Sequence, residues 1–193
     1  MKKVLITGFD PFGGEKINPA YEAVKLLPDE IGGAKIIKKE IPTVFQKGPD
    51  AVYEEIQSSK PDYVLCIGQA GGRSQVTPEW VGINFRNARI ADNEGNQPLQ
   101  TSVVENGPEA YFTMLPVFRM VEKMKENGIP ASVSYTAGTY VCNDVMYSVL
   151  HYCHTEFKRC KRWLYACTFC DGTNSESACR NSWNEFKRYC QSY

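Results

Sequence analysis

Cys142 is the residue of this chain best suited to covalent chemistry, within the segment TYVCND at 139–144. Apolar residues at helical spacing follow it and predict a helix that begins near Asn143, so Cys142 is expected at a helix N-terminus. The free N–H groups and the positive end of the helix dipole favour the thiolate there, which is the nucleophilic form of cysteine. The position alone leaves a second interpretation open, a buried and unreactive apolar cysteine.

A carboxylate and a glycine-rich segment are the other features that could take part in chemistry. Glu79 stands in a predicted loop between a proline and a tryptophan, and most carboxylates in loops are simply solvated. The sequence GFDPFGG at 8–14 lies between a predicted strand and a predicted helix, but it lacks the GxGxxG spacing and the lysine of phosphate-binding loops. It therefore predicts a tight turn. Phe9 and Phe12 make an apolar pocket wall the alternative, because exposed aromatic rings are costly.

An alternation of strands and helices must position these residues. Apolar periodicity predicts strands at 2–7, 35–41, 63–67 and 132–135, and helices at 19–27, 49–58, 115–127 and 143–154. The continuous apolar run at 63–67 is typical of a strand that is covered on both faces. Strands separated by helices favour a layered α/β fold.

The overall composition is that of one ordinary domain. The chain has 193 residues and 21.8 kDa, enough to bury a sizeable core without disulfides or a structural metal. Its 22 Lys and Arg residues balance 22 Asp and Glu residues, so no basic excess suggests nucleic-acid binding. No apolar run is long enough for a membrane span, and the N-terminal apolar stretch breaks at Thr7-Gly8, which favours a strand over a signal peptide. We expect a cytoplasmic protein that binds neither nucleic acid nor membrane.

Seven short motifs share their order and spacing with one enzyme family. They are GFDPFGG at 8–14, Asn18-Pro19, CIGQAGGR at 66–73, Pro78-Glu79, Ile83-Asn84, ARIADN at 88–93 and YVCN at 140–143. Through them the chain resembles pyroglutamyl peptidase I, also called pyrrolidone-carboxylate peptidase, a family of cysteine peptidases that remove N-terminal pyroglutamate from peptides. The resemblance covers about residues 2–157. It implies a three-layer α/β/α fold with a central twisted mixed sheet, no metal or cofactor, and a homotetramer.

The same resemblance implies roles for individual residues. Cys142 is the nucleophile, and Glu79 is the carboxylate that orients a catalytic histidine. Phe9, Phe12, Ile90, Tyr140 and Val141 form apolar walls around the lactam ring, Asn18 and Gln69 contact the lactam amide, and Arg89 lies near the oxyanion. The division suits the substrate, because pyroglutamate is a small neutral cyclic amide that apolar walls and a few amide partners can hold. N–H groups at the helix start can stabilise the oxyanion.

The catalytic histidine is missing from its expected place. The family carries it about 24 residues after the cysteine, in a segment like GFxHVPFxxEQ, whereas the matching stretch here is WLYACTFCDGT at 163–173 with Ala166 in the histidine position. His151 and His154 are the only histidines of the sequence, and both fall near the end of the helix that follows Cys142. We expect them to be ordinary helix-end residues, which the helix dipole favours, and not the missing base.

The composition of the last 36 residues differs from that of the rest. Residues 1–157 contain 38 Ile, Leu, Val and Met residues, whereas residues 158–193 contain one and hold five of the eight cysteines. If the first base of the Trp163 codon is dropped, the codons that follow permit Gly-Phe-Thr-His-Val-Pro-Phe-Val-Thr-Glu-Gln, which restores the family segment with its histidine. We therefore interpret 158–193 as a frameshifted tail that replaces the last strand and helix of a single domain.

Other interpretations of the tail remain open. Cys167 and Cys170 form a CxxC pair that Cys160 and Cys179 could complete to four zinc ligands, but the spacing lacks a second close pair. A disulfide framework is the weaker alternative for a chain expected in the cytoplasm. The sequence is compatible with two functions: a cysteine exopeptidase acting on pyroglutamyl peptides, and a non-catalytic pyroglutamyl-peptide binder or unstable pseudogene product.

Overall fold

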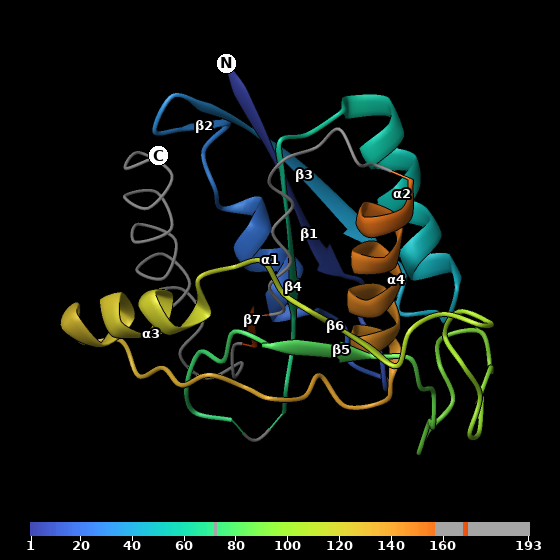
Figure 1. Cartoon of the computed structure of the whole chain (residues 1–193). Helices are drawn as coiled ribbons and strands as arrows, with labels where there is room; N and C mark the ends of the chain where they lie inside the picture. Colours follow the sequence, from blue (N-terminus) through green and yellow to red (C-terminus); the bar gives the residue numbers. More distant parts are fainter. Residues whose placement is uncertain (72, 157–167, 170–193) are drawn as a thin grey trace.

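A central sheet lies between two layers of helices (Figure 1). The computed structural model describes residues 1–71, 73–156 and 168–169. Within this part of the chain the strands are β1 (Lys2–Phe9), β2 (Glu30–Ile31), β3 (Ala34–Ile41), β4 (Tyr63–Gly68), β5 (Val81–Ile83), β6 (Ala110–Phe112) and β7 (Thr168–Phe169). The helices are α1 (Pro19–Lys25), α2 (Lys47–Ser59), α3 (Val117–Glu126) and α4 (Val141–Thr155). The α/β class predicted from the sequence is confirmed.

The main sheet is mixed and has the strand order β2-β3-β1-β4-β7. Strands β3, β1, β4 and β7 run parallel, and only the short β2 is antiparallel to its neighbour β3. The connection from β1 to β3 runs in one direction across the sheet, and the connection from β3 to β4 returns past β1. Because both crossovers follow the right-handed rule, α1 and α2 lie on opposite faces. A separate two-stranded ladder pairs β5 with β6.

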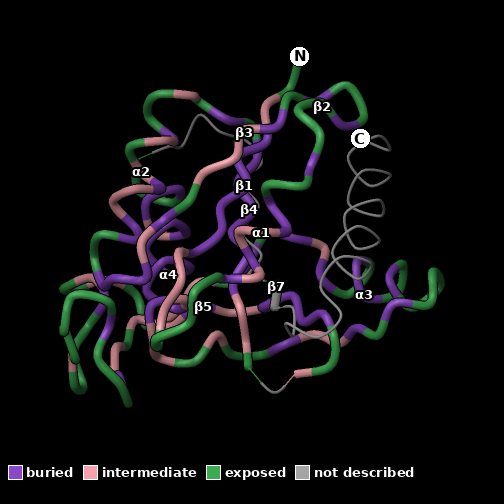
Figure 2. Tube along the Cα trace, turned by 180° about the vertical axis from the view of Figure 1, so that it is seen from behind, coloured by how far each residue is buried: buried purple, intermediate pink, exposed green. Residues whose placement is uncertain are grey.

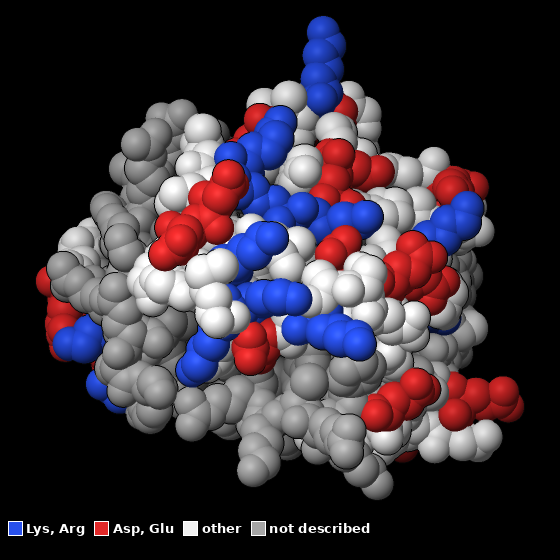
Figure 3. Space-filling view, turned by 90° about the horizontal axis from the view of Figure 1, so that it is seen from above, with Lys and Arg blue, Asp and Glu red and all other residues white. Residues whose placement is uncertain are grey.

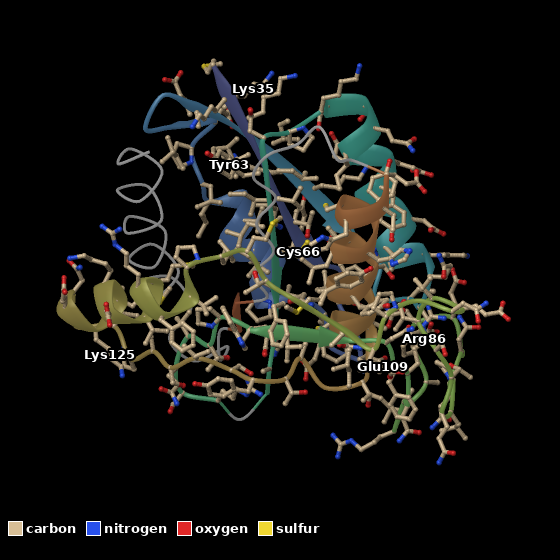
Figure 4. The ribbon with its side chains drawn as sticks, in the orientation of Figure 1. Lys35, Tyr63, Cys66, Arg86, Glu109 and Lys125 are labelled. Carbon is tan, nitrogen blue, oxygen red and sulfur yellow. The ribbon has the colours of Figure 1, made fainter. Side chains whose placement is uncertain are left out.

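Each face of the sheet has its own apolar core. One core joins alternate residues of β1 and β4, such as Ile6 and Leu65, to α1 and α3. The other joins the intervening residues, such as Leu5 and Cys66, to α2 and α4. Figure 2 shows β1 and β4 buried along most of their length, and Figure 4 shows Cys66 between the sheet and α4. The prediction that residues 63–67 form a strand covered on both faces is confirmed.

The predicted strand at 132–135 is wrong as a continuous strand. Ala131 and Ser134 make only isolated parallel bridges, to Val76 and Glu79. The backbone hydrogen bonds on either side of Pro78 follow a parallel ladder, with Ser134 N donating to Pro78 O at 2.9 Å and Ser132 N to Val76 O at 3.1 Å. Proline has no N–H to donate between them, so the ladder is interrupted at its centre.

Prolines also set two helix boundaries that differ from those predicted. Helix α3 begins at Val117 and not at 115, since Pro116 is its N-cap and disfavours helical backbone at the residue before it. Helix α2 begins at Lys47, two residues before Pro49, because proline is tolerated in a first turn where the N–H has no helical acceptor. The helix predicted after Asn18 begins at Pro19, and Asn18 Oδ1 accepts from Ala20 N at 3.0 Å as its cap.

Positive and negative side chains are interspersed on the surface seen from above (Figure 3). This pattern agrees with equal totals of 22 basic and 22 acidic residues along the chain. Among the described residues, no helix is both long and apolar enough to cross a membrane.

Candidate active site

The site lies where β1 and β4 end side by side. Their connections leave in opposite directions across the sheet, and the crevice beyond the carboxyl ends of two such strands is where open α/β sheets bind ligands. The turn after β1 is tight, as predicted, with φ of 65° at Gly13 and 84° at Gly14. Gly8 is needed for close packing there, because a Cβ on it would lie 2.6 Å from Cα of Tyr21.

Cys142 is the second residue of α4, so the helix begins slightly earlier than predicted. It is a half-buried thiol that packs against the apolar core formed with α2 and α4. No side chain in the described part of the chain caps this helix, and the first intrahelical bond runs from Asp144 N to Tyr140 O at 3.1 Å. The N–H groups of the first turn therefore have no helical acceptor and can serve an anionic group beside the sulfur.

Two polar residues fix this first turn, and sequence reasoning gave neither a role. The Asn143 side chain accepts from Ile83 N at 2.9 Å and donates to Ile83 O at 2.9 Å and Phe85 O at 3.1 Å. Asp144 is fully buried and pairs with Arg86 at 2.6 Å, while its other oxygen accepts from Gln46 N at 2.9 Å. Figure 4 shows Arg86 near the start of α4. The signal available in the sequence was two polar residues in the first turn of an otherwise apolar helix.

Glu79 is fully buried, contrary to the usual behaviour of a carboxylate in a loop. Its Oε1 lies 3.5 Å from Arg73 Nη1, and its backbone bridges to Ser134. Its Oε2 has no hydrogen-bond partner among the described residues. Glu79 precedes β5 by two residues, and Asn143, next to Cys142, holds the last residue of the same strand. A buried carboxylate with one oxygen left over can orient a second polar group.

The aromatic residues predicted as pocket walls gather around Tyr140, the N-cap of α4. The Tyr140 and Phe12 rings are 6.5 Å apart, and Phe45, which sequence reasoning missed, meets Tyr140 edge-on at 5.4 Å. Phe9 is 2% exposed and lies in the same core as Val141, which is fully buried. Apolar side chains, several of them buried, thus pack at the start of α4.

The polar residues of the predicted substrate site differ in how far the protein already uses them. Asn18 is buried, and besides capping α1 it donates from Nδ2 to Asp10 O at 2.9 Å. Gln69 is half-buried directly after β4. Arg89 and Ile90 are both exposed, in the segment that Asp92 anchors by accepting from Phe45 N at 2.9 Å. The substrate contacts of these residues stay predictions.

Both histidines lie far from Cys142 along α4. They follow it by nine and twelve residues, which at about 1.5 Å per residue is roughly 13 and 18 Å along the helix axis. Tyr111 engages both, since its hydroxyl is 3.0 Å from His151 Nδ1 and its ring stacks on His154 at 4.8 Å. The prediction that they are helix-end residues is confirmed for His154, which lies in the last turn of α4, whereas His151 lies about one turn earlier.

Comparison with known proteins places the chain among peptidases. Residues 2–165 match the model of the pyroglutamyl peptidase family. The chain belongs to this family, whose members are cysteine peptidases. Pyrrolidone-carboxylate peptidases of Clostridium perfringens and Enterococcus faecalis are 61% and 57% identical to it over 156 and 155 residues, which is 81% and 80% of this chain and 73% of each relative.

Solved structures of the family share the fold. Pyroglutamyl peptidase I of Bacillus amyloliquefaciens superimposes with a TM-score of 0.88 at 42% identity, covering 99% of this chain and 96% of that one. Pyrrolidone carboxyl peptidase of Thermococcus litoralis gives a TM-score of 0.87 at 31% identity, covering 100% and 96%. The three-layer fold expected from the resemblance is therefore confirmed.

The predictions for the tail fall mostly outside the described residues. These predictions include Ala166 in the histidine position and the alternative zinc ligands Cys160, Cys167, Cys170 and Cys179. Across residues 1–71, 73–156 and 168–169, no group of three or more His, Cys, Asp or Glu side chains could hold a metal ion.

The buried Glu79 makes the stability of the fold depend on pH. Burial raises the pKa of Glu79 from its ordinary 4.5 to about 7, which Ser134 and Arg73 oppose only in part. A raised carboxyl pKa means that folding favours the neutral form of Glu79. The contribution of this neutral carboxyl to the unfolding free energy is therefore fully present below about pH 4.5 and is lost as pH rises through about 7. Relative to the parent, Glu79→Gln should therefore gain about 3 kcal/mol of unfolding free energy between about pH 4 and pH 8.

Urea unfolding of the two proteins across this pH range measures the difference. Burial also raises the pKa of Asp144, but this residue is present in both proteins, so its contribution cancels from the difference in unfolding free energy. Identical pH dependence in the two proteins would contradict a buried, ionisable Glu79.

Proposed function

We propose that this chain derives from a cysteine exopeptidase that hydrolyses the amide bond after an N-terminal pyroglutamyl residue of peptides and proteins, with Cys142 as the nucleophile and Glu79 as the carboxylate that orients a histidine. In the complete reaction Sγ of Cys142 attacks the amide carbonyl carbon, and the leaving amine must receive a proton before the acyl group is released to water. A histidine held by Glu79 supplies that proton. In this chain Ala166 stands at the histidine position, so amide cleavage is greatly slowed while binding is retained.

The observation that carries this proposal is the position of Cys142 in the uncapped first turn of α4. Phe9 and Tyr140 belong to the same apolar cluster as Cys142, and Phe12 packs on Tyr140, which supplies the apolar side chains that a small neutral lactam requires. N–H groups of the turn are available to an oxyanion, for which Arg89 is the proposed further donor. Asn18 and Gln69 are the proposed partners of the lactam amide, and Ile90 and Val141 complete the apolar walls.

Two observations support a frameshifted tail as the cause of the missing histidine. The family match ends at residue 165, and the matches to the two relatives cover about four-fifths of the chain. Strand β7 lies inside the stretch 163–173 and pairs with β4 directly before Gln69. The restored histidine would therefore lie two residues before β7, a strand that borders the site. We propose that residues 1–157 and this tail make up one domain. We also propose that copies of this domain assemble into the homotetramer implied by the resemblance.

The missing histidine also favours a second function, a non-catalytic binder of pyroglutamyl peptides. Both functions require the same pocket beside Cys142, and only turnover separates them. An unstable pseudogene product would instead lack a formed pocket.

Alkylation of Cys142 tests the pocket in the chain as it stands. Iodoacetamide should label Cys142, and pyroglutamyl-alanine amide at saturating concentration should slow this labelling at least about tenfold by covering the sulfur. Prolyl-alanine amide lacks the lactam carbonyl and should protect far less. Peptide mapping by mass spectrometry locates the label, and the buried Cys66 and Cys153 are internal controls in the same digest.

Cys142→Ser is the matched control, because it keeps the pocket and removes only the reactive atom. Equal labelling rates with the two peptides would exclude a pyroglutamyl pocket at this cysteine. Protection without any turnover, in this chain and in one with the restored reading frame, would favour the binder.

A further inference from the structure

Arg73 is a charged residue of the motif at 66–73 for which the proposed reaction gives no role. Its Nη1 lies 2.9 Å from Thr77 Oγ1, 3.5 Å from Glu79 Oε1 and 3.4 Å from Ser134 Oγ. The Arg73 side chain is 38% exposed, whereas Glu79 is completely buried. One end of the guanidinium therefore reaches from the surface to the inner carboxylate.

The two oxygens of Glu79 are not equivalent. Oε1 faces Arg73, and Oε2 has no hydrogen-bond partner in the described part of the chain. A carboxylate that orients an imidazole must be ionised and must offer an oxygen that no other group occupies. Burial alone would oppose the first condition, because it favours the neutral acid.

We propose that Arg73 is a positioning residue that holds Glu79 by Oε1, favours its ionised form and leaves Oε2 to orient a histidine at position 166 when the reading frame is restored. This inference rests on the proposed function and deepens it. Thr77 and Ser134 act with Arg73 by fixing Nη1 from two sides, on the two segments that flank the interrupted ladder at Pro78. Arg73 acts through Glu79 and does not touch the substrate.

The charges around Glu79 make the effect measurable. Among the described residues, Arg73 is the charged group that acts on this carboxylate, and Ser134 is the neutral polar group that acts on it. Both lower the pKa of Glu79 against the larger effect of burial. Loss of the guanidinium should therefore raise the titration midpoint by at least about one pH unit, the usual size for an opposite charge at this range.

Carbon-13 NMR of the carboxyl carbons in the full-length chain, labelled at glutamate, tests this directly. The Glu79 signal is identified by its absence in Glu79→Gln. Arg73→Gln should raise the Glu79 midpoint by about one unit or more, and Arg73→Lys should stay closer to the parent because it keeps the charge. Lys35→Gln removes the same charge at an exposed site of β3 and should leave the midpoint unchanged. Equal midpoints in Arg73→Gln and Lys35→Gln would overturn the proposal.

A milder variant covers the case in which Arg73→Gln does not fold. Thr77→Val keeps the shape of the buried side chain but removes the 2.9 Å acceptor of Arg73. It should raise the Glu79 midpoint in the same direction by a smaller amount, and an unchanged midpoint would count against the proposal.

Activity in the chain with the restored reading frame provides a second readout. There Arg73→Gln should shift the acidic limb of the pH profile of kcat/KM to higher pH, and Arg73→Lys should reverse most of this shift. A merely structural role of Arg73 would not shift the limb. An acidic limb that stays in place would contradict the proposal. If the restored chain does not turn over at all, the proposed function fails while the NMR titration still decides the role of Arg73.

Discussion

A protein expressed after deletion of the first base of the Trp163 codon should hydrolyse pyroglutamyl amides at least about a thousand times faster than the 193-residue chain. The alternative frame places histidine at the position of Ala166, 24 residues after Cys142. That histidine takes the proton of the thiol and returns it to the leaving amine, whereas the present sequence has alanine at that position. Loss of one member of such a catalytic set costs several orders of magnitude because the members act as a unit.

Release of a chromogenic amine from a pyroglutamyl amide, compared between the two proteins, measures the effect. A histidine-to-alanine change in the restored protein is the matched control and should return the rate to that of the 193-residue chain. Comparable rates from the two proteins would show that the histidine is not needed. An inactive restored protein would undermine the peptidase function. The nucleotide sequence around codons 157–162 shows independently whether one base has been gained or lost.

The sequence predicted the elements that carry the site because their signals are local. Asn18 marks the start of α1 as a side-chain cap, the apolar run at 63–67 marks the buried β4, and the apolar spacing after Cys142 marks α4. Each of these depends on residues a few positions apart. Their order along the chain was then sufficient to predict alternating layers of sheet and helix.

Other parts depend on contacts between distant segments and could not be predicted in this way. Glu79 is buried because Arg73 and Ser134 close around it, whereas an isolated loop carboxylate is expected in solvent. The strand predicted at 132–135 has the right composition, but its partner strand contains Pro78 and cannot complete the ladder. The buried pair of Arg86 with Asp144 joins residues 58 positions apart, so no local pattern indicates it.

The covalent intermediate gives the most direct test that Cys142 is the nucleophile of a pyroglutamyl peptidase. The 4-nitrophenyl ester of pyroglutamate needs no proton on its leaving group, so the 193-residue chain should react without the histidine. The Cys142 thiolate, whose proton has gone to solvent, bonds through sulfur to the carbonyl carbon, and 4-nitrophenolate departs with the electron pair of the broken ester bond. Without a base to activate water, the thioester should then accumulate.

Mass spectrometry of the intact protein and of its peptides should find one pyroglutamyl group, on Cys142. Cys142→Ser should remain unmodified, and the 4-nitrophenyl ester of N-acetylproline should label the parent at least about a hundred times more slowly. Acylation at another residue, or equal acylation by the two esters, would contradict the account.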